Sequence, residues 1–392
     1  MKRSTKQPSN ATKKLTIGLV IDDSLDRPDG VQQYVLTLGA WLSGRGHDVH
    51  YIASETSRDD LPNLHVLGRS LHVRFNGNRL RTPLPASSKA IRELLQQQKF
   101  DILHVQMPYS PMLAGKVLHA AKNYLGTAKL ATFHIFPDSE LVRIGSKLLA
   151  ATQRRQYRLF DKIISVSSAA LQFAHETFGV TSDIVPNGVA LEQFTHAASR
   201  KRPESPFTIV FLGRLVERKG CRELIEAVAA ARDSLPADFR LRIGGRGPLL
   251  DSLKRRTTEL GITEHVTFEG FIAETDKADF LADSDMILLP STGGESFGIS
   301  VVEALAASRG VVLAGNNAGY ASVMHGLRDQ LVDARDATGD FAAKIRRYSN
   351  MTIAERSQLA DKQRQYAEQF SIEHVGARIE ATYRDALRRR CK

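Results

Sequence analysis

The chain of 392 residues is poor in cysteine and has no long hydrophobic run. Its two cysteines, Cys221 and Cys391, lie far apart, which excludes a disulfide framework and a cysteine-based metal cluster. No apolar run approaches the length of a membrane span. Residues 1–14 are polar and basic without an apolar centre, which argues against a secretory signal. We therefore expect a cytoplasmic protein.

Acidic residues are scarce at both ends. Residues 1–14 carry five basic and no acidic side chains, residues 383–392 carry five and one, and these ends hold +9 of the net charge of +11. A nucleic-acid enzyme spreads basic and aromatic residues along its fold, so no nucleic-acid partner is expected. Basic ends suit reversible contact with an anionic membrane, and solubilising tails explain them equally well. A predicted helix adds basic residues beside leucines: Arg143, Lys147, Leu148, Leu149, Arg154, Arg155, Arg158 and Leu159.

Short apolar runs alternate with helical patterns along the whole chain. The runs are typical of buried parallel strands. They are 15–21, 49–53, 102–105, 130–133 and 163–166, and then 208–212, 241–243, 266–268, 286–289 and 311–314. Alternating strands and helices predict doubly wound sheets, so the fold class is α/β, with two Rossmann-like domains facing a central cleft.

The composition changes near residue 200, where His196 to Pro206 is polar, charged and contains proline. Such a segment predicts a linker between domains. The expected organisation is a disordered basic tail at 1–14, an N-terminal domain at 15–196, a linker at 197–206, a C-terminal domain at 207–370, and a helix at 371–392 that returns to the first domain.

The segment from Gly293 to Glu303 carries the clearest functional signal. It joins an apolar strand to a helical run, and a glycine-rich loop at a helix start offers backbone N–H groups and a positive dipole end to a phosphate. Glu295 and Glu303 stand eight residues apart, at most about 12 Å along a helix. One carboxylate can then meet a sugar and the other a ribose, with a diphosphate between them. The arrangement suits a nucleotide sugar.

The same segment also matches G-x-S-x-G, the nucleophile elbow of α/β-hydrolases, with Ser296 as nucleophile. An elbow turns directly from strand to helix, whereas four residues, Pro290 to Gly293, intervene here. Asp333 and His374 are available downstream as acid and base, but nothing fixes their geometry. A plain glycine-rich connection with solvated glutamates is the remaining alternative.

The loop from Gly213 to Gly220 follows the first strand of the second half. It places Arg214 and Lys219 around a turn before a helix. An arginine supplies two parallel donors and a lysine a point charge, which together suit a diphosphate leaving group. A solvated charged loop is the alternative.

Three further features lie at predicted strand ends. Gly244-Gly245-Arg246-Gly247 resembles a dinucleotide fingerprint, but Leu250 occupies the place of the third glycine, which disfavours a hydride-transfer enzyme. Gly30 opens the first predicted helix, where the helix N-terminus can receive a phosphate. Of the two histidines near strand ends, His104 and His134, the second is the better site candidate because it terminates its strand.

Taken together, in this order and spacing, these loops resemble the retaining glycosyltransferases of family 4, which have the GT-B fold. The similarity runs from Leu15 to about Tyr383. Its markers are Gly30–Gln32, Thr132–His134, Val185–Val189, Gly213–Gly220 and Gly293–Glu303. Within the family, Phe211–Arg214 and Gly293–Gly298 are most similar to the phosphatidylinositol alpha-mannosyltransferases.

The resemblance implies roles for individual residues. Arg214 and Lys219 hold the donor diphosphate, Glu295 grips the sugar hydroxyls and Glu303 bonds the ribose. Four residues are expected to be catalytic: His134, Arg214, Lys219 and Glu295. The expected donor-binding set is Gly30, Gly213, Arg214, Lys219, Gly245, Gly294, Glu295, Phe297, Gly298, Ile299 and Glu303. Such enzymes need no metal in the site and retain the anomeric configuration by front-face attack.

The departures from the family pattern concern the acceptor. Asp29 replaces the first glycine of a Gly-Gly pair, Gln106 stands where a second histidine is common, and Ser308–Gly310 replaces a Gly-x-Pro-like turn. Ile135–Asp138 lacks the threonine and lysine that hold the inositol phosphate in the mannosyltransferases. The candidates on the acceptor side are Gln32, Arg79, Gln106 and Glu217.

The sequence therefore predicts a retaining hexosyltransferase with a nucleotide-sugar co-substrate and no bound cofactor or metal. The first guess for the donor is GDP-mannose, with a UDP-hexose as the alternative, and the acceptor is a lipid or a glycan, phosphatidylinositol included. A nucleotide-sugar epimerase or a soluble-glycoside synthase on the same fold, a non-catalytic nucleotide-sugar binder and a serine hydrolase are the alternatives. The predicted location is the cytoplasm, at the inner face of the cell membrane if the basic ends bind lipid.

Overall fold

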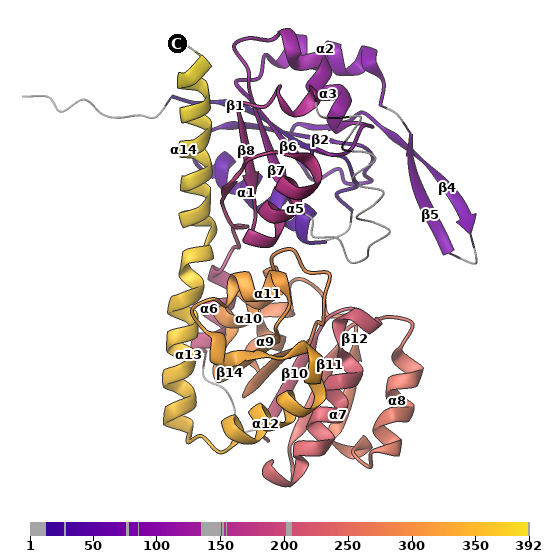
Figure 1. The fold of residues 1–392 in the computed structure, drawn as a ribbon, viewed down its shortest axis with the longest axis vertical. Helices are drawn as coiled ribbons and strands as arrows, with labels where there is room; N and C mark the ends of the chain where they lie inside the picture. Colours follow the sequence, from indigo (N-terminus) through magenta and orange to yellow (C-terminus); the bar gives the residue numbers. More distant parts are fainter. Residues whose placement is uncertain are drawn as a thin grey trace, which may run out of the picture. The chain divides into compact units, whose positions relative to one another are not determined.

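The computed structural model describes residues 13–26, 29–75, 78–84, 86–134, 150, 153, 155–200 and 206–390, with only the backbone for 69–84. The chain forms two compact units. The first consists of residues 1–131, 159–161 and 383–392, and the second of residues 132–158 and 162–382. Each unit has its own strand-end loops, and the elements are labelled in Figure 1.

The N-terminal sheet has the strand order β3-β2-β1-β6-β7-β8-β9. Its strands are β1 (Thr16–Ile21), β2 (Asp48–Ala53), β3 (Leu64–Val66), β6 (Ile102–Gln106), β7 (Ala128–Phe133), β8 (Lys162–Ser165) and β9 (Asp183–Ile184). β1 pairs in parallel with both β2 and β6. The five strands predicted in this half are all present, and the short strands β3 and β9 extend the sheet at its edges.

Helices and one hairpin accompany this sheet. They are α1 (Gly30–Gly44), α2 (Ser88–Gln98), α3 (Ala114–Ala120), α5 (Ser168–Phe178) and the antiparallel pair β4 (Arg69–Phe75) and β5 (Asn78–Leu84). The strands lack polar alternation because both faces are covered, as expected for a parallel sheet. One covered face joins Val20, Leu103 and Val105 to Ile91 and Leu95 of α2.

The C-terminal sheet has the strand order β12-β11-β10-β13-β14-β15. Its strands are β10 (Thr208–Leu212), β11 (Arg240–Gly244), β12 (Val266–Gly270), β13 (Met286–Leu289), β14 (Val311–Gly315) and β15 (Leu331–Val332). Every neighbouring pair is parallel. The central strands β10 and β13 lie side by side, so the loops that follow them open at the same edge of the sheet.

Helices cover this second sheet. They are α6 (Glu192–Ser199), α7 (Cys221–Ala231), α8 (Leu250–Glu259), α9 (Lys277–Ala282), α10 (Ile299–Ala307), α11 (Ala318–Val323), α12 (Ala337–Ser349) and α13 (Ile353–Ala367). The 3-10 turns of the chain are η1 (Ala121–Asn123), η2 (Glu217–Lys219), η3 (Arg232–Ser234), η4 (Thr263–His265), η5 (Arg328–Gln330), η6 (Ala334–Asp336) and η7 (Glu368–Phe370).

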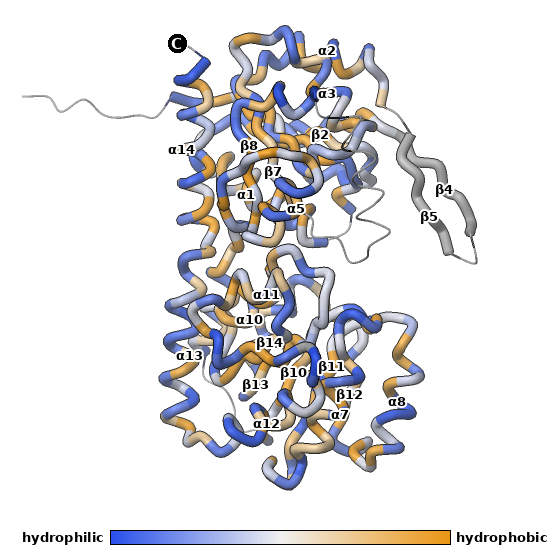
Figure 2. The backbone as a smooth tube through the Cα atoms, in the orientation of Figure 1, coloured by the Kyte–Doolittle hydropathy of each residue, from blue (hydrophilic) through white to orange (hydrophobic). Residues whose placement is uncertain are grey.

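Alternation along the strands divides the core of this sheet in two. Ile209 and Phe211 of β10 pack in one cluster with α7 and α12, whereas Val210 packs in the other with α10. Successive residues of a strand point to opposite faces, so both faces must be apolar when helices cover both. α10 is mostly hydrophobic in Figure 2, whereas α13 is mostly hydrophilic, as expected for a helix with one face in water. The predicted doubly wound α/β fold is confirmed.

The closing helix α14 (Ile372–Arg390), yellow in Figure 1, contributes to both units. Tyr383 is fully buried, and its hydroxyl lies 2.7 Å from Nδ1 of His104. Arg390 donates from Nε to Oδ2 of Asp161 at 2.7 Å. These contacts lie within the first unit, so the expected return of the helix to the first domain is confirmed. His104 packs there, with its pKa lowered to about 3 by burial.

Several predictions concern segments with little or no description. Helix α6 extends to Ser199, three residues into the predicted linker, and residues 201–205 lie outside the described residues. Residues 1–12, Ile135–Asp138, Cys391 and most of the predicted basic helix at 143–159 also lie outside them. The domain limits drawn from the sequence stay a prediction.

Candidate functional site

The loops that follow β10 and β13 bring charged side chains together. The first loop runs through η2 to α7, and the second runs from Pro290 to Gly298 and then into α10. Both leave the carboxyl edge of adjacent parallel strands, where open α/β sheets bind their ligands. Lys219 and Glu295, which the sequence assigned to one site, belong to these two loops.

Glu295 is the centre of a cluster of charges. Its Oε1 accepts hydrogen bonds from Nζ of Lys219 at 2.7 Å, Nη1 of Arg218 at 2.9 Å and Oγ of Ser291 at 3.0 Å. The side chains of Lys219 and Glu295 are 17% and 14% exposed, and that of Arg218 is 30% exposed. Shielding from water strengthens these charge-assisted bonds relative to a surface pair.

The structure adds Arg218 to the cluster, and the predicted role of Arg214 at the diphosphate stays a prediction. Arg218, not Arg214, contacts the glutamate, and the Arg214 side chain is exposed. The sequence signal for Arg218 was its place beside Lys219 in η2, directly before Gly220. Ser291 carried no signal of its own, because a serine after a strand-ending proline is common in loops. Glu217, an acceptor-side candidate, is exposed at the start of η2.

Lys219 stays charged in this cluster. Burial, the largest contribution, acts to lower its pKa, but Tyr320 and Glu295 outweigh it, so the pKa is raised. Tyr320 is fully buried on α11, and burial raises its pKa, so that its phenol is neutral near pH 7. The Tyr320 hydroxyl lies 3.4 Å from Oγ of Ser300. The cluster is therefore a site with excess positive charge.

Two glycines occupy strand-end loops at positions where a side chain would clash. Gly298 precedes α10 with φ of 109°, and a Cβ there would lie 2.6 Å from the Tyr320 ring. Gly245 has φ of 141°, and a Cβ there would lie 1.8 Å from the carbonyl oxygen of Gly213. Side chains at these positions would clash and force a disfavoured backbone conformation. The sequence predicted both glycines, and also Gly213, as parts of the site.

Glu303 forms a second charge cluster on the buried side of α10. Its carboxylate lies 2.9 Å from Nζ of Lys277 on α9, and Lys277 lies 2.8 Å from Glu274. Burial acts to lower the pKa of Lys277, but the two carboxylates raise it overall. Glu303 thus has a lysine partner 26 residues away in the chain. The predicted contact between Glu303 and a ribose stays a prediction.

The remaining donor-side candidates line the same loop. Phe297 is buried and packs edge-on against Phe370, with ring centroids 5.7 Å apart, so its side chain belongs to the core. Ile299 is the first residue of α10 and is half-buried. Gly294 has φ of 69°, two residues after the loop's contact with Arg218 through Thr292.

Candidates that precede residue 135 occupy several strand-end loops. Gly30 is the exposed first residue of α1. Gln32 is buried, and its amide donates to Asp23 at 2.9 Å. Gln106 and His134 are buried at the ends of β6 and β7. Arg79 lies in β5, opposite Arg74, and its side chain is outside the description.

The hydrolase alternative is not supported. Asp333 is bound to Arg335 at 2.9 Å, and His374 on α14 lies 2.8 Å from Oγ of Ser371, the residue that directly precedes this helix. The proposed acid and base are therefore each engaged with a near neighbour in sequence. Ser296 sits in an open loop rather than a tight strand-to-helix turn, because the chain runs from Pro290 to Gly298 between β13 and α10.

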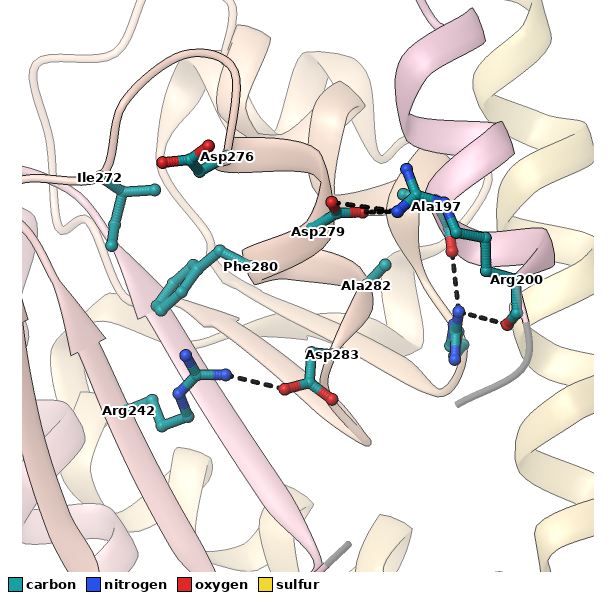
Figure 3. A pocket seen from close by; sticks show the side chains of 10 residues that line it. Ala197, Arg200, Arg242, Ile272, Asp276, Asp279, Phe280, Ala282 and Asp283 are labelled. Carbon is teal, nitrogen blue, oxygen red and sulfur yellow. Dashed lines mark hydrogen bonds and ion pairs between the residues drawn. The ribbon is translucent and has the colours of Figure 1, made fainter. Parts of the chain in front are cut away.

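A cavity of about 440 Å³ lies elsewhere, among α6, α9 and β11 (Figure 3). Its charges neutralise one another: Arg200 pairs with Asp279 at 3.0 Å and Arg242 with Asp283 at 2.9 Å. None of the predicted site residues lines this cavity. Its paired charges leave no excess positive charge for an anionic ligand, in contrast to the Glu295 cluster.

The described part of the chain shows neither a metal cluster nor a membrane-spanning helix. No group of three or more histidine, cysteine, aspartate or glutamate side chains gathers there in a way that could hold a metal ion. No described helix combines the length and the apolar character that a membrane crossing requires.

Family models and a solved structure of known glycosyltransferases match this chain. A family model described as "Glycosyl transferases group 1" matches residues 192–370, and one described as "Glycosyltransferase Family 4" matches residues 28–193. A glycosyltransferase structure from Rickettsia africae ESF-5 aligns with a TM-score of 0.71 and 18% identity, covering 95% of this chain and 99% of that one. The fold is that of GT-B glycosyltransferases, and the matching family models identify the chain as a glycosyltransferase.

Curated relatives narrow the assignment. The phosphatidyl-myo-inositol mannosyltransferase of Mycobacterium tuberculosis (strain CDC 1551 / Oshkosh) is 33% identical over 305 residues, 76% of this chain and 77% of the relative. A GDP-mannose-dependent alpha-(1-6)-phosphatidylinositol monomannoside mannosyltransferase of the same strain is 31% identical over 203 residues, 47% of this chain and 52% of the relative. The chain belongs to glycosyltransferase family 4.

Proposed function

We propose that this glycosyltransferase transfers mannose from GDP-mannose to a lipid or glycan acceptor with retention of configuration. The observation that carries the proposal is the Glu295 cluster, where two cations meet one carboxylate at the ligand-binding edge of the C-terminal sheet. Excess positive charge suits a diphosphate. The names of the mannosyltransferase relatives, one of which includes GDP-mannose, support the choice of sugar and base.

Each donor contact has a physical reason. Lys219, Arg214 and Arg218 neutralise the charge that develops on the leaving diphosphate, and such preorganised charge is often the largest contribution to catalysis. Backbone N–H groups at Gly298 and Ile299 add the positive end of the α10 dipole. Glu295 accepts hydrogen bonds from the sugar hydroxyls and Glu303 from the ribose. Gly30 packs against the phosphates, and His134 borders the reacting carbon.

The proposed reaction is a front-face substitution at the anomeric carbon. The bond between that carbon and the β-phosphate oxygen breaks, and the acceptor hydroxyl oxygen forms its bond on the same face. The acceptor proton passes to the departing phosphate, so GDP leaves with the electron pair of the broken bond. Lys219 stabilises that oxyanion, and its raised pKa keeps it charged throughout the step.

The acceptor is less constrained than the donor. Relatives named for phosphatidyl-myo-inositol favour a lipid acceptor, and the sequence from Ile135 to Asp138 lacks the threonine and lysine expected for an inositol phosphate. We propose a lipid or glycan acceptor with a different polar group. A soluble-glycoside synthase and an epimerase remain the alternatives, and neither has a supporting contact of its own in the described residues.

Contact with the inner face of an anionic membrane is part of the proposal. At the C-terminal end, Arg388 and Arg389 share Asp385 and are largely exposed, whereas Arg390 is engaged by Asp161. The two exposed arginines and the basic residues 1–14 are the charges available to a lipid surface.

The direct test is a screen of GDP-, UDP- and ADP-sugars for hydrolysis by the purified protein, followed by product analysis. GDP-mannose should be consumed fastest, with release of GDP and mannose. Preferred consumption of a UDP-sugar would overturn the donor assignment. Accumulation of an isomerised nucleotide sugar would identify an epimerase instead.

A further inference from the structure

A single oxygen of Glu295 collects the donors of three side chains. Oε1 receives Lys219, Arg218 and Ser291, all at 3.0 Å or less. The N–H groups of Lys219 and Arg218 and the hydroxyl of Ser291 could equally donate to a diphosphate oxygen, because carboxylate and phosphate oxygens are both anionic acceptors. A carboxylate in this position competes with a phosphate for the site.

The backbone of Glu295 packs closely against α11. A Cβ at Gly319 would approach the carbonyl oxygen of Glu295 to 2.4 Å. The carboxylate, by contrast, is held by the three side-chain donors. A change of rotamer at Glu295 would break these bonds and expose Arg218 and Lys219 to a ligand.

We propose that Glu295 is an internal anion of the donor site. Without donor it binds Arg218 and Lys219; the diphosphate replaces it, and the released carboxylate then accepts hydrogen bonds from the sugar. The inference rests on the proposed function, since it takes a nucleoside diphosphate sugar as the donor. It adds a competition within the site that the proposed function does not contain.

The competition gives donor and product different affinities. Both ligands must displace the carboxylate. Only the fraction of molecules in which the cations are free can bind, so the apparent affinity of each ligand is its intrinsic affinity multiplied by that fraction. For the donor, hydrogen bonds between its sugar hydroxyls and the displaced carboxylate offset this loss of binding free energy. The product nucleoside diphosphate lacks the transferred hexose and gains no such hydrogen bonds, so it binds more weakly and is released more easily. Glu295 thereby couples sugar recognition to product release.

The test is a calorimetric titration of inorganic pyrophosphate and of GDP onto the full chain. The variants Glu295→Gln and Glu295→Ala remove the internal anion. Both should bind pyrophosphate about tenfold tighter than the wild type, because the cations are freed. They should also show a larger rise in melting temperature with pyrophosphate. The two variants differ in shape, so one decides the matter if the other fails to fold.

Glu226→Gln is the matched control. Glu226 pairs with Arg256 at 2.9 Å on the outer side of α7 and α8, so the same substitution removes an ion pair outside the site. Pyrophosphate affinity should be unchanged in this variant. A gain equal to that of Glu295→Gln would show a general charge effect and overturn the proposal.

The two proposals fail in different ways. If the wild type binds GDP and Glu295→Gln binds pyrophosphate and GDP no tighter, the internal anion is wrong and the donor site stands. If no variant and no wild-type protein binds pyrophosphate or any nucleoside diphosphate, the proposed function is wrong and the internal anion with it.

Discussion

The strand-end loops of the two units use their carboxylates differently. In the first unit, Asp22 accepts from Ser54 Oγ at 2.6 Å and Leu113 N at 2.7 Å, and Asp26 accepts from Thr56 Oγ1 at 2.6 Å. In the second unit, Glu295 and Glu303 pair with cations. Aspartates held by neutral hydroxyl and amide groups tie loops together, whereas the pairing of Glu295 with two cations leaves positive charge that an anionic ligand can use.

From this contrast we expect the ligand chemistry in the second unit and a loop-holding role in the first. Asp22 also accepts from Ser110 and from the first backbone amide of α3, so one carboxylate joins the loops after β1, β2 and β6. The pKa of Asp26 is lowered: burial opposes this, but the hydrogen bonds from Thr56, Ser24 and Ser57 outweigh it. The carboxylates of the second unit should therefore control binding and turnover, and those of the first should control stability.

The largest effect should come from the cations of the second unit. Lys219→Ala and Arg214→Ala should each reduce turnover by roughly 10²–10³, because a preorganised charge on a leaving oxyanion contributes on that order. Steady-state kinetics with GDP-mannose measures this, and circular dichroism should remain native. Arg222→Ala, an exposed cation on α7, is the control. Normal turnover in Lys219→Ala would remove the second unit from the chemistry.

A smaller effect is expected from the aspartate of the first unit. Asp22→Ala should lower the free energy of unfolding by about 2–3 kcal/mol, because buried donors lose a charged acceptor. Urea denaturation followed by circular dichroism measures the change. Pyrophosphate affinity of the folded variant should stay normal. Weakened pyrophosphate binding without lost stability would contradict the division between the units.

A variant of Glu303 should distinguish ribose binding from diphosphate binding within the second unit. Glu303→Ala should weaken GDP binding about tenfold, in line with loss of one charge-assisted hydrogen bond to the ribose. Pyrophosphate, which has no ribose, should bind as before. Equal losses for both ligands would show that Glu303 acts only through Lys277, and unchanged GDP binding would place it outside the ribose site.

The smallest effect per residue concerns the membrane. Removal of residues 1–12 together with Arg388→Gln and Arg389→Gln should reduce sedimentation with anionic vesicles at low salt, each charge contributing at most about 1 kcal/mol. Arg390 is left intact because its bond to Asp161 holds α14. Absence of wild-type binding even at low salt would favour a soluble acceptor. Binding retained by the variant would shift the contact to the basic segment at 143–159.

The sequence was sufficient for features that depend on local pattern. Continuous apolar runs predicted the central strands, and the glycine-rich connection from Gly293 to Gly298 was recognised between a predicted strand and a predicted helix. Contacts between residues that are far apart in the chain could not be predicted from the sequence. Lys277 meets Glu303 from another helix, and His104 meets Tyr383 across 279 positions. Arg218 of η2 contacts Glu295 from the loop of another strand, and spacing alone does not specify that geometry.

The most direct measurement is a crystal structure of the full chain with GDP. We predict that the diphosphate binds at Lys219 and Arg218. The Glu295 carboxylate, which lies 2.7 Å from Nζ of Lys219 in the free protein, should then have turned away from that atom. The ribose should lie beside Glu303. The diphosphate could instead lie elsewhere, such as in the cavity lined by Arg242 and Asp279, while Glu295 still contacts Lys219. That result would contradict the proposal that the diphosphate replaces Glu295 at the two cations.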